Sequence, residues 1–217
     1  MKKTSVAVVT GGHSYDVPKF HKLFNSLKDL NPVIQHMDDF ASSPQEVRDA
    51  YDAVLFYIML MEGPADDGMP WYAGKPKSAL EHLGETAQGI VILHHAILAY
   101  PKWSVWSEIV GINDRGFGYY ADQTLRLDAA DAEHPITRGL SGWQMVDETY
   151  TMSDAGAGSR ILLTVDHPKS MKSIAWTRQH KKSRVFCFES GHDNQTWRDG
   201  NFKEVLRRGI LWAAGAI

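Results

Sequence analysis

The fold of this chain is decided by one stretch, Gly89-Ile90-Val91-Ile92-Leu93-His94-His95-Ala96. Its apolar run is typical of a strand that is buried on both faces of a sheet. The run ends in two histidines, and the residues after them predict a helix over 96–110 that is interrupted near Pro101. A buried strand, a polar turn and a helix together form the repeating unit of α/β proteins.

The sequence before this stretch repeats the same alternation. Apolar runs predict strands over 5–9, 33–34 and 53–58. One apolar helix face is predicted between the first two strands, and Ser43-Pro44-Gln45-Glu46 has the pattern of a capping box that opens a second helix. A Gly-, Pro- and Met-rich loop over 59–76 and a helix at about 77–87 follow. This order predicts a parallel sheet with helices on both faces.

The pattern changes after residue 117. Short strands are predicted over 119–127, 148–152 and 161–165, followed by a hairpin of 173–177 with 184–189. A closing helix presents Phe202, Val205, Leu206, Gly209 and Trp212 on its inner side. Because no repeat or linker interrupts the chain, we expect one α/β domain over 1–217 with a mostly parallel central sheet.

Composition excludes several classes of protein. The chain has 217 residues and a net charge of −3, and it is 43% hydrophobic, so disorder and a nucleic-acid or anionic-membrane partner are disfavoured. The only cysteine is Cys187, which fits a reducing compartment. The first apolar run is too short for a secretory leader, and no stretch approaches the roughly 20 apolar residues of a membrane span. We therefore expect a cytoplasmic protein.

Histidines follow three of the predicted strands: His13, the pair His94-His95, and His192. Carboxyl ends of parallel strands border one crevice, so these side chains are expected to converge. Imidazoles exchange protons near neutral pH and also bind metal ions. Taken singly, each is more often a loop or capping residue, but the coincidence with three strand ends favours a shared site. His94 occupies the place of the nucleophile in a strand–turn–helix elbow, so we expect it to face the pocket.

Two acids and a tyrosine begin a later strand, in the sequence Asp147-Glu148-Thr149-Tyr150. The acids either cap the strand or orient a histidine, and the sequence favours neither interpretation. Trp71, Trp103 and Trp197 lie in or beside the histidine-bearing loops, where an indole can stack on a sugar ring, although packing is the more common role.

Two other features argue against familiar chemistries. Cys187 lies within an apolar strand, where a thiol is usually an inert core residue, so thiol catalysis is not expected. Gly11-Gly12 lacks the further residues of a phosphate-binding loop, so nucleotide binding has little support.

Together, an ordered set of motifs over nearly the whole chain resembles the ThuA-like (trehalose-utilisation) family. They are Gly-Gly-His at 11–13, Leu-His-His-Ala at 93–96, His-Pro-Ile-Thr at 134–137, Asp-Glu-Thr-Tyr at 147–150, Ala-Trp-Thr-Arg at 175–178, Arg-Val-Phe at 184–186, Gly-His-Asp at 191–193 and Leu-Trp-Ala at 211–213. The resemblance implies a three-layer, flavodoxin-like sandwich related to class I glutamine amidotransferases. It places His94 where those enzymes carry their cysteine and His192 where they carry their triad histidine, so glutaminase activity is not expected.

Three functional hypotheses follow. In the first, an enzyme of the isomerase, lyase or hydrolase type acts on a sugar or keto-sugar: His94 or His95 is the base, His192 is the acid or orienter, and Glu148 fixes a tautomer. In the second, the protein binds or senses carbohydrate without catalysis. In the third, a divalent metal such as zinc is held by His13, His94 (or His95), Glu148 and His192.

In each case the partner is a small carbohydrate, and homo-oligomers remain open. The residues expected to contact it are His13, Trp71, Trp103, Tyr150, Asp193 and Trp197.

Overall fold

The computed structural model describes residues 3–217. In this part of the chain, no helix combines the length and the apolar composition needed to cross a bilayer. In chain order the elements are β1 (Thr4–Gly11), α1 (Val17–Ser26), β2 (Leu30–His36), α2 (Met37–Ser42), α3 (Gln45–Arg48), β3 (Ala53–Ile58), the 3-10 helix η1 (Trp71–Ala73), α4 (Pro76–Glu81), β4 (Gly89–Leu93), the 3-10 helix η2 (His94–Leu98), α5 (Ser104–Val110), β5 (Gly118–Ala129), β6 (Trp143–Thr151), β7 (Arg160–Val165), β8 (Ser173–His180), β9 (Ser183–Phe188), α6 (Asn194–Trp197) and α7 (Gly200–Ala213).

The strands form one nine-stranded sheet in the order β2-β1-β3-β4-β9-β8-β7-β5-β6. Neighbouring strands from β2 to β9 are parallel, whereas every pairing from β9 to β6 is antiparallel. The expectation of a mostly parallel sheet is therefore wrong for the half that contains β8, β7, β5 and β6. Those strands are joined without crossover helices, so nothing forces them to run parallel.

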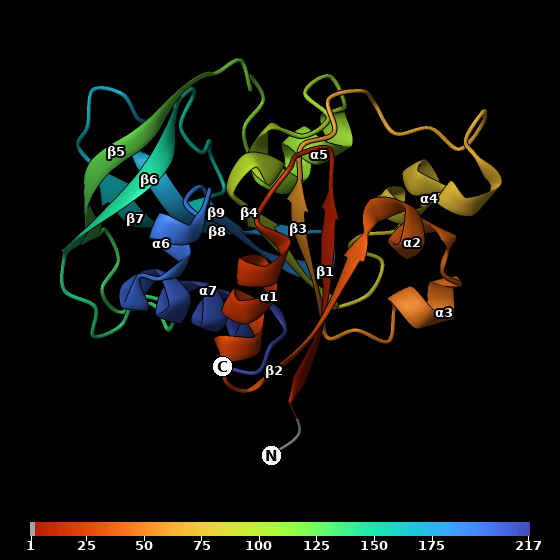
Figure 1. Cartoon of the computed structure of the whole chain (residues 1–217), viewed down its shortest axis with the longest axis horizontal. Coiled ribbons are helices and arrows are strands. Elements are labelled where there is room, and N and C mark those ends of the chain that lie inside the picture. The colour runs from red at the N-terminus through yellow and green to blue at the C-terminus, as the bar shows by residue number, and fades with distance from the viewer. Residues whose placement is uncertain (1–2) are drawn as a thin grey trace.

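Helices cover both faces of the parallel half, as Figure 1 shows with α1 and α7 on one side and α2 and α4 on the other. The packing of β1 explains this arrangement: Val6 and Val8 join the core beneath α1 and α7, while Ala7 and Val9 join the core beneath α2, α4 and α5. Successive side chains of a strand point to opposite faces, so a continuously apolar strand needs a cover on each. The three-layer arrangement agrees with the sequence prediction.

Local hydrogen bonds set the helix boundaries, and one of them corrects the sequence prediction. The side chain of Asp16 accepts a hydrogen bond from the backbone N–H of Lys19 and begins α1, while Asp199 begins α7 in the same way. The capping box predicted at 43–46 does not form. Ser43, which follows α2, instead donates its hydroxyl to the carbonyl of Asp39 within that helix, and α3 has no side-chain cap.

Candidate functional site

The turn after β4 presents a histidine in a strained conformation. His94 has a φ of 53°, which lies in the left-handed region that side chains other than glycine rarely occupy. Its Nδ1 lies 2.6 Å from the carbonyl oxygen of Glu189. A carbonyl can only accept a hydrogen bond, so Nδ1 carries a proton and Nε2 is the ring nitrogen that faces away from this carbonyl. The turn and this bond together fix both the direction and the tautomer of His94.

Two side chains from distant parts of the sequence, those of Glu148 and His192, lie close to His94 Nε2. His94 Nε2 lies 3.2 Å from His192 Nδ1 and 3.5 Å from Glu148 Oε1, and His192 Nδ1 lies 3.4 Å from the same carboxylate oxygen. All three atoms lie within 4.8 Å of one another. We call His94, Glu148 and His192 the His–Glu–His cluster; two imidazoles and one carboxylate are a donor set that suits a divalent transition metal.

Two neighbouring residues hold the cluster in place. Tyr150 lies two positions after Glu148 on β6, and its hydroxyl donates to Glu148 Oε1 at 3.0 Å and lies 2.8 Å from His94 Nε2. Asp147 faces the loop after β9, where its carboxylate accepts the backbone N–H groups of Gly191 at 2.8 Å and His192 at 3.1 Å. The two acids thus have different tasks: Glu148 meets the imidazoles, whereas Asp147 fixes the backbone that carries His192.

Burial and neighbouring groups shift the pKa values of the histidines and acids at this site in different directions. Burial lowers the pKa of His192, and the neighbouring charge of His94 lowers it further, which favours the neutral imidazole. Burial alone would raise the pKa of Glu148, but hydrogen bonds and charges from His94, His192 and Tyr150 outweigh it and lower the pKa. These shifts favour an ionised Glu148 beside a neutral His192. By contrast, burial raises the pKa of both Asp147 and Glu189.

A pocket of about 300 Å³ opens beside the cluster. Glu148 and Tyr150 form the wall that it shares with the cluster. Its full lining is His13, Met59, Phe117, Tyr119, Glu148 and Tyr150. His192 keeps 28% of its side chain exposed, while His94 has none and meets the pocket only through its neighbours. The sequence prediction that His94 itself faces the pocket therefore needs this correction.

The four histidines that follow strand ends lie close together, but they differ in whether they line the pocket or belong to the cluster. The ring of His13 lies 4.6 Å from that of His95 and 5.8 Å from that of His192, and His94 lies 5.2 Å from both His95 and His192. His13 lines the pocket but is not in the His–Glu–His cluster.

His95 lies beneath the pocket. It is 1% exposed, and its Nδ1 lies 3.0 Å from the carbonyl of Ile58, to which it donates. Burial, followed by the charge of His94, lowers its pKa to about 2. His95 is therefore neutral at physiological pH, and this state does not suit an acid that must donate a proton to a ligand.

The structure does not bring the tryptophans predicted to contact a sugar to the pocket lining. Trp71 is 93% exposed on η1 and contacts Tyr72. Trp103 is half-buried and packs against Tyr100. Trp197 is 3% exposed and packs against Phe20 and Tyr57 in the core.

Asp193, also predicted to contact the ligand, caps α6 by accepting the N–H of Gln195 at 2.8 Å. The aromatic side chains that do line the pocket, Phe117 and Tyr119, were missed by sequence reasoning. The only sign of them in the sequence is that two aromatic residues begin a strand with exposed positions. This pattern is common at sheet edges and does not indicate a pocket.

Cys187 is fully buried in β9, and burial raises the pKa of its thiol. Its sulfur lies 3.8 Å from the carbonyl oxygen of Val110, so it is a core residue as the sequence predicts. The turn after β4 carries His94, not the cysteine.

Comparison with known proteins identifies a family and a fold. A family model described as "ThuA: Trehalose utilisation" matches residues 9–213. A solved structure described as ThuA-like, from Parabacteroides merdae, superposes with a TM-score of 0.76 at 19% identity and covers 98% of this chain and 90% of its own. A cytoplasmic protein from Salmonella typhimurium gives a TM-score of 0.68 at 11% identity, with coverages of 96% and 98%.

A glutamine amidotransferase from Thermotoga maritima gives a TM-score of 0.54 at 10% identity, with coverages of 96% and 98%. At these identities the likenesses establish the fold alone. No curated protein matches the chain.

Proposed function

Because the chain belongs to the ThuA family of trehalose utilisation, we propose that it converts a small sugar or keto-sugar by histidine-based acid–base chemistry with the help of a divalent metal ion. The observation that carries the proposal is the meeting of His94 Nε2, His192 Nδ1 and Glu148 Oε1 within 4.8 Å, at the wall of a pocket sized for one small ligand. Binding alone seldom requires so many titratable groups in one place.

The donor set fits a metal ion on chemical grounds. His94 Nδ1 donates to the carbonyl of Glu189, so Nε2 is the ring nitrogen directed at the cluster, and this arrangement is the usual outer support of a metal-bound histidine. A neutral His192 and an ionised Glu148 supply the other two donors. When bound, a divalent ion such as zinc would polarise a sugar oxygen.

The other residues of the pocket supply proton transfer and orientation. A keto-sugar has acidic protons beside its carbonyl, and an imidazole on the pocket wall can remove one near neutral pH. His13 lines the pocket and lies outside the cluster, so we assign the removal of the sugar proton to His13. The Tyr150 hydroxyl keeps Glu148 Oε1 directed toward the two imidazoles. The sequence favours His94 or His95 as the base. Because both are buried, that role suits them less than it suits His13.

The same site argues against glutamine hydrolysis, and we propose that the protein lacks it. Amidotransferases of this fold class attack glutamine with a thiolate, whereas the elbow here carries His94 and the thiol of Cys187 is buried elsewhere. We also propose a cytoplasmic location, which the lone cysteine and the name of the Salmonella relative support.

The test combines metal analysis with a substrate screen. Untagged protein is expected to retain about one divalent ion per chain and to convert members of a keto-sugar panel, with activity lost on chelation and restored by the ion. Full turnover after chelation would reject metal assistance. Saturable sugar binding with no turnover in the metal-loaded protein would instead support a carbohydrate-binding or regulatory protein, and release of ammonia from glutamine would contradict the proposed lack of glutaminase activity.

A further inference from the structure

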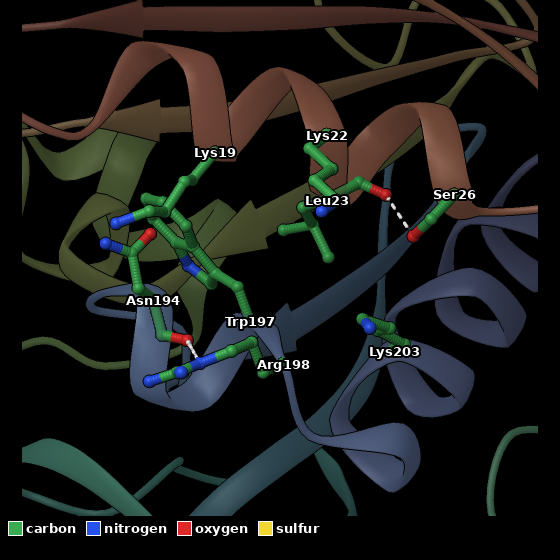
Figure 2. A pocket seen from close by; sticks show the side chains of 8 residues that line it. All are labelled: Lys19, Lys22, Leu23, Ser26, Asn194, Trp197, Arg198 and Lys203. Carbon is green, nitrogen blue, oxygen red and sulfur yellow. Dashed lines mark hydrogen bonds between the residues drawn. The ribbon is translucent and has the colours of Figure 1, made fainter.

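A second pocket lies between α1 on one side and α6 and α7 on the other, as Figure 2 shows. It has a volume of about 210 Å³ and shares no lining residue with the pocket beside the His–Glu–His cluster. Leu23 and Trp197, each 3% exposed, form apolar parts of its lining. Drug-sized ligands occupy roughly 300–1,000 Å³, so this pocket suits a smaller molecule.

Of the residues that the structure describes, four cationic side chains and no acidic side chain line this pocket. Lys19 and Lys22 come from α1, Arg198 follows α6, and Lys203 comes from α7. Lys19 is paired with Asp16 at 3.0 Å. Within residues 3–217, the other three have no ion pair; Arg198 donates only its Nε, to the carbonyl of Asn194. Three cations without an ion-pair partner among the described residues therefore line one pocket of a chain whose net charge is −3.

We propose that this pocket binds a small phosphate monoester. Cationic side chains that line one pocket create a positive potential there, which attracts an anion. A monoester carries a charge of about −1.5 to −2 near neutral pH, which matches three cations better than a single carboxylate does. The planar guanidinium of Arg198 can donate two N–H groups to phosphate oxygens, and the lysines act as point charges. Leu23 and Trp197 contact the body of the ester.

The pocket is connected to the histidine site through one indole ring. Trp197 Nε1 donates to the carbonyl of Gly191 at 2.8 Å, immediately before His192. Tyr57 donates to the carbonyl of His192 at 2.9 Å, and Phe20 packs against both aromatic rings. A ligand that contacts Trp197 therefore touches a side chain that is hydrogen-bonded to the loop carrying His192. The proposal of a binding site does not depend on the function of that loop.

Calorimetric titration with phenyl phosphate tests the proposal, with inorganic phosphate and phenol as probes of the separate parts. Phenyl phosphate should bind with one site per chain and more tightly than inorganic phosphate, its affinity should fall as salt rises, and phenol should not bind measurably. Lys22→Gln and Arg198→Gln should each weaken phenyl phosphate about tenfold to a hundredfold, as expected for a lost hydrogen bond to a charged group. Both positions are exposed, so circular dichroism should show unchanged folding.

The matched controls locate the bound probe. Lys172 is exposed and does not line the pocket, so Lys172→Gln should bind as the wild type does. No binding of phenyl phosphate at millimolar concentration would overturn the proposal. Equal affinity in the wild type and in the Lys22 and Arg198 variants would also overturn it. Binding that is lost in His94→Gln but kept in those two variants would place the phosphate in the histidine site and would contradict the proposal equally.

Discussion

In the parallel half of the sheet the site residues follow strand ends, whereas in the antiparallel half they lie within a strand. His94 follows β4 and His192 lies beyond β9, at the edge where crossover connections place the loops. Glu148 and Tyr150 instead lie inside β6, two residues apart and therefore on the same face. The parallel half supplies two imidazoles, one of them on a strained turn, and the antiparallel half brings a carboxylate and a hydroxyl against them. Each half is incomplete without the other.

The largest expected effect is the loss of ion binding when the parallel half loses its elbow histidine. His94→Gln keeps a side chain that can donate to the carbonyl of Glu189, so the protein should fold, but it removes the Nε2 lone pair. Zinc affinity should fall by more than about a hundredfold, since even outer supports of metal ligands are worth 10–100-fold. Competition with a chromogenic chelator measures this. His21→Gln, on the exposed surface of α1, should change nothing; lower stability with intact zinc affinity in His94→Gln would assign His94 a purely structural role.

The antiparallel half should respond to Asp147→Asn with a loss of stability. The carboxylate accepts N–H groups from both Gly191 and His192, and an amide can accept only through its oxygen, which leaves one buried donor facing an NH₂ group. The expected cost is about 1–3 kcal/mol in the free energy of unfolding, with weaker zinc binding because the His192 loop loosens.

Urea unfolding measures the cost of Asp147→Asn. The control Asp128→Asn, at an exposed position of β5, should stay within about 0.5 kcal/mol of the wild type. If the two variants unfold at the same urea concentration, Asp147 does not fix the loop.

A core position of the parallel half should affect stability and leave the site alone. Cys187→Ala removes one buried sulfur from β9 and should cost on the order of 1 kcal/mol. Zinc affinity and turnover should match the wild type, because the thiol is not part of the cluster. A folded Cys187→Ala protein without turnover would bring thiol chemistry back into consideration.

The smallest expected effect concerns His180 at the far end of β8. Burial, and then the charge of Lys181, lowers the pKa of His180 below its ordinary value of 6.5. The unfolded chain therefore takes up a proton that the folded protein resists, so this histidine reduces stability as the pH falls below about 6.5. His180→Gln should lose less stability than the wild type between pH 7 and pH 5, measured by urea midpoints. An equal loss in both proteins would show that His180 does not contribute.

The comparison of the two halves also explains what the sequence could predict. Continuous apolar runs such as 53–58 and 89–93 show buried parallel strands, and histidines directly after such runs must lie at one edge. The convergence of His13, His94, His95 and His192 follows from that local pattern. The sequence does not record that His94 lies in a turn at φ 53°, nor that His94 and His95 are both buried.

The antiparallel half was less predictable because its strand order depends on long-range pairing. Nothing in residues 119–127 shows that β5 lies between β7 and β6, nor that its register shifts between Tyr120 and Gln123. Phe117 and Tyr119 reach the pocket through that pairing. The sequence left the role of the acids at 147–148 open, and only the fold shows that Asp147 binds the backbone and Glu148 meets the imidazoles.

Anomalous diffraction from crystals grown with zinc tests the central claim, that both halves of the sheet form one metal site. The account predicts a single strong peak at about 2.0–2.2 Å from His94 Nε2, His192 Nδ1 and Glu148 Oε1, the usual zinc distances to nitrogen and carboxylate oxygen. The peak should disappear in crystals of Glu148→Gln, which removes only the antiparallel half's ligand. A peak that persists in that variant, a peak bound by other residues, or an undisturbed cluster with no peak in the wild type would contradict it.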